Sequence, residues 1–268
     1  MKLKTLFSLT IASALVFACS SDNTKKTKAA SEIEEVSVDQ IVEDIENIPT
    51  PTSFELMTMI NKAGIGYMFD VTNSLSNREN YLSTKQKALN LGVYAADLSY
   101  DVAYMKKAET EEYLKCILEM ATDLNISVNV DKISAQFQNN IDNLDSLSII
   151  VRDLFKESQY ILNQTSQVET ALFFLIGSWI ESSYICVTVA EGAEKASDFA
   201  SVALGHFDYA TTILKYLEGQ KEKSDFAYFY EQLTNVQAAV AELNADKTNA
   251  EKRDALTNII VSLRNSII

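Results

Sequence analysis

The sequence predicts an all-α fold, and three observations carry this prediction. Pro49 and Pro51 are the only prolines among the 268 residues, although average usage would place about ten in the stretch that follows them. Glycine is also scarce, with seven in the chain. β-Proteins need turn residues often, whereas helix pairs need few. Apolar residues make up 47% of the chain, which is enough for a core. Because the connections between helices look short, we expect one bundle of about eight antiparallel helices.

The N-terminus has the layout of a secretory signal, expected to cover residues 1–18. Lys2 and Lys4 precede an apolar run from Leu6 to Phe17, which is too short to span a membrane. The run Val16-Phe17-Ala18-Cys19 then places a small residue directly before a cysteine and resembles a bacterial lipobox. The resemblance implies cleavage before Cys19 and lipid on that residue.

Residues 19–48 are expected to form a lipidated tether. Positions 20–30 are small and polar, which is typical of a flexible linker, and 31–47 has the pattern of a short acidic helix. Pro49 and Pro51 end this segment and mark the start of the helical domain, 49–268.

Helix start signals recur within that domain. The runs Ser83–Gln86, Ser166–Glu169 and Thr248–Glu251 fit the capping box, in which a hydroxyl and a carboxyl or amide satisfy backbone N–H groups. Gly192 and Gly219 suit helix ends. We therefore expect helices near 53–64, 84–107, 110–124, 131–162, 167–190, 195–218, 224–243 and 249–267.

The helix at 167–190 is apolar enough to consider as a membrane span. Glu181 interrupts it, and a central carboxylate is costly in hydrocarbon. We therefore expect a helix buried inside the protein.

Two segments of the predicted helices resemble each other. Residues 91–100 and 176–184 both read glycine, one residue, an aromatic, then a carboxylate and a tyrosine. In each helix the glycine would permit a close neighbour. Two interpretations stay open: two related halves, near 53–125 and 131–220, or chance similarity between buried helices.

Charge and missing motifs exclude several function classes. The net charge of −14 should repel nucleic acid, so no nucleic-acid partner is expected. The one histidine, His206, lacks the neighbours of a hydrolase or metal motif, and no phosphate-binding loop or EF-hand occurs. We expect no catalytic residues, no metal and no cofactor, with His206 partly exposed on a helix. A hydrolase without familiar motifs is the remaining enzymatic alternative.

Two polar stripes run along apolar helices. The first is Asn90, Tyr94, Asp97, Asp101 and Tyr104, whose spacing places them on one helix face. The second includes Gly177, Glu181, Tyr184, Thr188 and Glu191. The stripes either face a common polar pocket for a cation, an amine or a polyol, or form a satisfied internal hydrogen-bond network. The candidate ligand-binding residues are Asn90, Tyr94, Asp97, Asp101, Tyr104, Glu181 and Tyr184.

Cys116 and Cys186 lie inside apolar helical stretches. They are either buried free thiols that act as small hydrophobic residues or, because an exported protein can form disulfides, a Cys116–Cys186 bridge.

The lipobox at Val16–Cys19, the run Asn90–Tyr100 and the run Gly177–Glu181 resemble those of all-helical lipoproteins of Bacteroidetes that lack an assigned activity. The resemblance implies an outer-membrane lipoprotein anchored through Cys19. Lys25, Lys26 and Lys28 follow the cysteine closely and favour a periplasm-facing protein over a surface-exposed one. We expect a non-enzymatic binding or assembly module of the bacterial envelope, with an envelope protein as partner. The alternative is a small-molecule or cation receptor that uses the carboxylate and tyrosine side chains.

Overall fold

A computed structural model describes residues 53–165, 167–191 and 204–268. The signal, Cys19, the tether, the capping box at Ser166 and the helix end at Gly192 lie outside these residues. The all-α prediction is confirmed, since the described part contains nine α-helices, one 3₁₀ helix and no strand. All described residues belong to one compact unit. The antiparallel arrangement and the two related halves stay predictions.

The elements follow the predicted order. They are α2 (Ser53–Lys62), η1 (Leu75–Asn80), α3 (Thr84–Ala103), α4 (Lys107–Asp123), α5 (Val130–Asn140), α6 (Leu144–Gln164), α7 (Val168–Glu191), α9 (Tyr209–Glu218), α10 (Ser224–Ala245) and α11 (Ala250–Asn265).

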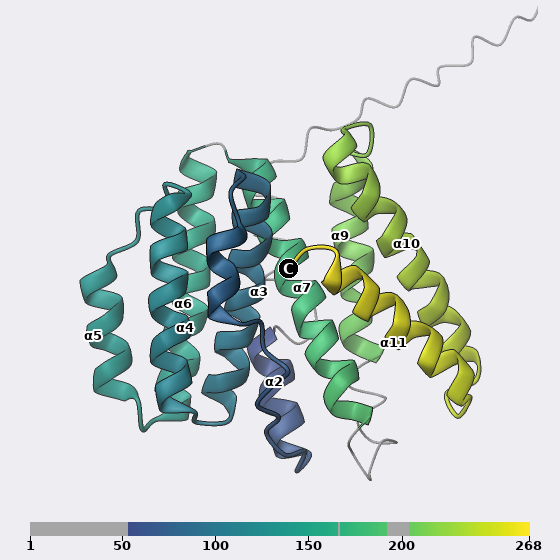
Figure 1. Ribbon diagram of the computed structural model, residues 1–268, viewed down its shortest axis with the longest axis horizontal. Helices are drawn as coiled ribbons and strands as arrows, with labels where there is room; N and C mark the ends of the chain where they lie inside the picture. The colour runs from purple at the N-terminus through teal and green to yellow at the C-terminus, as the bar shows by residue number, and fades with distance from the viewer. Residues whose placement is uncertain (1–52, 166, 192–203) are drawn as a thin grey trace, which may run out of the picture. The chain divides into compact units, whose positions relative to one another are not determined.

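Helices α3 and α7 form the most extensive helix pair of the bundle. Helix α7 also contacts α2, α6, α9 and α11, while α3 also contacts α2, α4 and α6. The C-terminal helices form a second group, in which α10 contacts both α9 and α11 (Figure 1). The segment from Val168 to Ala190 is long and apolar enough to cross a membrane, but 89% of its most apolar window is buried inside the protein. Helix α7 is thus the buried helix that its sequence predicts.

Two glycines let α3 and α7 approach closely. A Cβ atom added to Gly92 would lie 2.1 Å from the carbonyl oxygen of Phe174, and one added to Gly177 would lie 1.9 Å from that of Leu89. The contacts are reciprocal, because each glycine meets the residue three positions before the other glycine. The prediction that each glycine permits a close neighbour is confirmed. Gly92 of α3 contacts α7, and Gly177 of α7 contacts α3.

The prediction of a single helix at 131–162 is wrong, because the helix is interrupted between α5 and α6. The side chain of Asn143 accepts a hydrogen bond from the Ser146 backbone N–H at 3.0 Å, and the Asn143 N–H donates to the Asn140 carbonyl. Asparagine and aspartate favour such caps over helix interiors. The cluster of these residues at 139–145 marks a helix boundary rather than a solvated helix face.

Helix α3 ends before its predicted limit of residue 107. Met105 adopts a left-handed backbone with φ of 54°, the Lys106 N–H donates to the Asp101 carbonyl and the Met105 N–H donates to Val102. This is a Schellman motif, which usually has glycine at the left-handed position. Because the residue at this position is methionine, the sequence does not indicate that the helix ends here.

Three other predicted helix boundaries, at Ser83, Gly219 and Thr248, can be compared with the structure. Gly219 caps the end of α9, as predicted. The capping box of Ser83 and Gln86 is confirmed. At α11 the cap is Asn249, whose side chain accepts from the Lys252 N–H, while Thr248 donates to Asp246 instead. The predicted cap at Thr248 is therefore wrong by one residue.

Candidate functional site

The polar stripe of α3 holds the segment that precedes this helix, residues 63–83. The segment runs along α3 in the opposite direction, so rising residue numbers on α3 meet falling numbers on the segment. The Tyr94 hydroxyl donates to the Ser74 carbonyl (2.9 Å), Asp97 Oδ2 accepts from the Asn73 N–H (3.1 Å), Asp101 Oδ1 accepts from the Tyr67 hydroxyl (2.8 Å), and the Tyr104 hydroxyl donates to the Ile65 carbonyl (2.8 Å).

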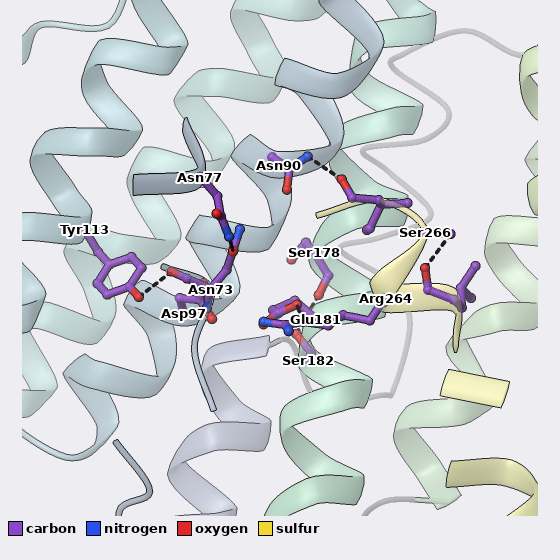
Figure 2. Close-up of polar contacts among 12 residues, drawn as sticks. Asn73, Asn77, Asn90, Asp97, Tyr113, Ser178, Glu181, Ser182, Arg264 and Ser266 are labelled. Atoms are coloured by element: carbon purple, nitrogen blue, oxygen red, sulfur yellow. Dashed lines mark hydrogen bonds and ion pairs between the residues drawn. The ribbon is translucent and has the colours of Figure 1, made fainter. Parts of the chain in front are cut away.

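Asn73 is the centre of this attachment, and it is 1% exposed. Besides the bond to Asp97, its Nδ2 donates to the Tyr81 hydroxyl and its Oδ1 accepts from the Asn77 side chain. Its carbonyl accepts from the Tyr113 hydroxyl of α4 at 2.7 Å (Figure 2). Every polar atom of Asn73 therefore has a partner, as buried polar groups require.

Helix α11 docks on α7 through a buried ion pair. Arg264 Nε and Nη2 each donate to one oxygen of Glu181 at 2.9 Å, and Glu181 is fully buried. Figure 2 shows Arg264 reaching from the chain's C-terminal end to Glu181. The guanidinium carbon also lies 4.1 Å from the ring centroid of Tyr184. Fork-shaped pairing of this kind is stronger than a single contact.

Asp97 of α3 and Glu181 of α7 are both fully buried, and their charges interact. Burial raises the pKa of Asp97 well above its usual range, and the negative charge of Glu181 raises it further. Burial also raises the pKa of Glu181, but the hydrogen bonds and charge of Arg264 act against this rise. Asp97 Oδ1 is buried and receives no hydrogen bond from the described residues. Burial and the charge of Glu181 therefore favour the protonated form of Asp97, while Arg264 favours the charged form of Glu181.

Asp101 occupies the neighbouring turn of α3. Burial raises its pKa to about 7, against the lowering effects of the Tyr67 hydroxyl and Lys106. Lys106 Nζ lies 4.3 Å from the ring centroid of Tyr67 and 5.1 Å from that of Phe69. Asp101 is therefore a third buried carboxyl, with a pKa raised to about 7.

The structure brings Asp97, Glu181 and Tyr184 together around Arg264, a residue that the sequence analysis missed. Asn90 lies apart from them, and its Nδ2 donates to the Ile267 carbonyl at 2.7 Å and to Gln86. The hydrogen bonds and ring contacts described for the seven candidate ligand-binding residues are made with other residues of the protein. Arg264 is 83 residues from Glu181, so no local pattern could have found it.

Cys116 and Cys186 are two free, buried thiols, so the first of the two alternatives is confirmed and the bridge between them is not formed. Burial raises the pKa of Cys116 to about 11 and also raises that of Cys186. Among residues 53–165, 167–191 and 204–268, no cluster of three or more acidic, histidine or cysteine residues could hold a metal ion.

A cavity of about 240 Å³ lies between α2, α3, α4, α6, α7 and α9. Its aromatic walls are Phe54, Phe155, Phe174, Trp179 and Tyr209, and serines add hydroxyl groups. None of Asn90, Tyr94, Asp97, Asp101, Tyr104, Glu181 and Tyr184 lines it. The cavity is thus separate from the carboxyl network.

His206 lies at this cavity and is 3% exposed. Its ring is stacked on that of Trp179 with centroids 6.2 Å apart, and its carbonyl accepts from Trp179 Nε1 at 3.3 Å. The prediction of a partly exposed histidine is wrong, because the ring packs against the aromatic side chains of α7 and of Phe207.

No known protein family, curated protein or solved structure matches this chain.

Proposed function

We propose that the chain is an exported, lipid-anchored binding protein of the bacterial cell envelope, which holds a small apolar molecule in the cavity beside α3 and α7. The cavity carries the binding part of this proposal. Ligand sites are concave, mostly apolar and furnished with a few polar groups. The cavity has aromatic walls, serine hydroxyls and a volume of about 240 Å³.

The envelope location rests on the N-terminal sequence. An apolar run of signal length ends at Cys19, and lipid chains on that residue would anchor the mature chain stably when more than one is attached. A Cys19→Ser variant, expressed in a bacterium fed an alkyne-tagged fatty acid, should lose the label and leave the membrane fraction. An unlabelled wild-type chain would contradict the anchor.

The polar alternative has less support. The carboxylate and tyrosine side chains of the two stripes bond to the 63–83 segment and to Arg264. These contacts favour the internal network over an amine or cation pocket. The motifs absent from the sequence favour binding over catalysis as the role of the chain.

Calorimetric titration with decanol, a neutral apolar probe, tests the proposed binding. Ala95 lines the cavity, so Ala95→Phe should fill it and abolish binding. Ala227 is exposed on α10, and Ala227→Phe should bind like the wild-type chain. Circular dichroism and thermal melting check that each variant folds, and Ala121→Leu offers a smaller filling change at another lining residue. Unchanged binding in both folded filling variants would overturn the proposed site.

A further inference from the structure

We infer that the ligand of the cavity is an amphiphile, with an apolar body of about ten carbon atoms and an anionic end group bound by Arg152. This inference rests on the proposed function and specifies its ligand. Three features carry it: the size and lining of the cavity, the engagement of its serine hydroxyls, and the charge at its exposed side.

The size of the cavity limits the apolar body. An engineered protein cavity of about 150 Å³ holds benzene, whereas this cavity measures about 240 Å³. Scaled by volume, the body would contain roughly ten carbon atoms. Phe155 and Phe174 lie against each other in the wall, with ring centroids 5.4 Å apart. An alkyl chain or a small ring system would gain dispersion contacts with these rings.

The serine hydroxyls in the wall already have acceptors within the protein. Ser99 donates to the Ala95 carbonyl at 2.8 Å, and Ser158 donates to the Leu154 carbonyl at 2.9 Å. Ser53, Ser178 and Ser182 form a hydroxyl cluster of their own. A strongly polar end group inside the cavity would therefore lack donors, so it should lie at the solvent-facing side.

The exposed residues of the lining are Arg152 and Glu55, so these two mark where the cavity meets solvent. Arg152 lies on α6 and forms no ion pair with another residue of the described ranges. A guanidinium binds carboxylate and phosphate groups through paired N–H donors. Glu55 would oppose an anion, but this residue takes part in another interaction within the protein. The charge available to a ligand at this side is that of Arg152.

The test compares three ten-carbon probes of different charge: decanoate, decanol and decylamine. Each is titrated calorimetrically, near neutral pH, into the purified chain carrying Cys19→Ala, so that no lipid attached to the protein competes. Because Arg152 is exposed, its contribution is modest, and we expect decanoate to bind about fivefold more tightly than decanol. Decylamine should bind more weakly than both.

Substitutions at Arg152 and Glu55 test whether the charges of these two residues cause the preference for decanoate. Arg152→Gln should make decanoate and decanol bind equally while leaving the affinity for decanol unchanged. Arg253→Gln removes the same charge from an exposed position of α11 and should preserve the preference. Glu55→Gln should strengthen decanoate binding, because it removes the opposing charge.

The outcomes separate the inference from the proposed function. If decanoate and decanol bind the unaltered site equally, or if decylamine binds most tightly, the anionic end group is wrong while the apolar site stands. A preference for decanoate that persists in Arg152→Gln also overturns the role of Arg152. If none of the probes binds, the proposed function itself fails.

Discussion

Glu181 of α7 and Arg264 of α11 form a two-pronged ion pair, with both N–O distances at 2.9 Å and the carboxylate fully buried. Asp97 of α3 adds a second acidic group and accepts a hydrogen bond from the backbone N–H of Asn73. One cluster therefore joins α3, α7, α11 and the 63–83 segment. Three of the predictions below concern this cluster and its surroundings.

Removing Arg264 should destabilise the fold strongly. The variant Arg264→Met leaves Glu181 buried without its cation, and breaking a buried pair in this way costs about 3–5 kcal/mol. The double variant Glu181→Leu with Arg264→Met should recover much of this loss, because both charges are then absent. Urea unfolding at neutral pH measures both. A loss below about 1 kcal/mol for Arg264→Met would show that the pair is weak.

Stability should fall as the pH rises from about 4, the ordinary pKa of aspartate in an unfolded chain, through 7. Burial raises the pKa of Asp101 to about 7 and raises that of Asp97 as well. Over this range the folded chain holds protons that the unfolded chain has released, so the free energy of unfolding decreases with pH. Each such proton contributes at most about 1.4 kcal/mol per pH unit.

The variant Asp101→Asn tests the source of this slope. It removes one titrating group and should flatten the pH dependence of unfolding between about pH 4 and 7. Asp131 is exposed on α5, and Asp131→Asn serves as the charge-matched control. Equal slopes in the two variants would contradict a raised pKa for Asp101.

The glycine contact between α3 and α7 should tolerate no side chain. In Gly92→Ala or Gly177→Ala the new methyl group would meet backbone atoms at 2.1 or 1.9 Å, so the helices must separate. Overpacking of this kind costs about 1–3 kcal/mol, and the rigid backbone partners place these variants at the upper end.

Gly205 provides the control for this pair. It lies in a helical turn, and a Cβ atom there would meet nothing within 4 Å. Gly205→Ala should be neutral or stabilise the protein by up to about 1 kcal/mol. Thermal melting of the three variants measures the difference, and similar losses in all three would rule out the close helix contact as the cause.

Met105→Gly should stabilise the protein. Met105 holds a left-handed backbone with φ of 54° at the end of α3, a conformation that costs a side-chain-bearing residue about 1 kcal/mol and glycine almost nothing. Asn125 has φ of 59° at the end of α4, but asparagine tolerates this region better. Asn125→Gly should therefore gain less in urea unfolding. A loss of stability in Met105→Gly would show that the methionine side chain contributes contacts that outweigh its backbone strain.

Features set by neighbouring residues could be predicted from the sequence alone. The Ser83 capping box depends on a residue three positions away, and the scarcity of proline and glycine limits the chain to helices. Gly92 and Gly177 signalled close packing because only a missing side chain permits it. The polar stripe on α3 was visible because helical periodicity places its members on one face.

The partners of these residues depended on the tertiary structure. The 63–83 segment has no helical pattern that would reveal Asn73 as the partner of Asp97, Tyr81 and Tyr113. The stop at Met105 went unrecognised because the residue at the left-handed position is not glycine. The cavity was not predicted because its lining comes from six helices that are distant in the sequence.

The sequence by itself determined the all-α class, the order of most helices and the burial of α7, because periodicity and caps act over a few residues. The tertiary structure alone decided that Glu181 pairs with Arg264, that His206 is buried against Trp179, and that an apolar cavity opens beside the carboxyl network. These relationships depend on how distant helices pack together, and side-chain packing across the bundle leaves no periodic signal along the chain.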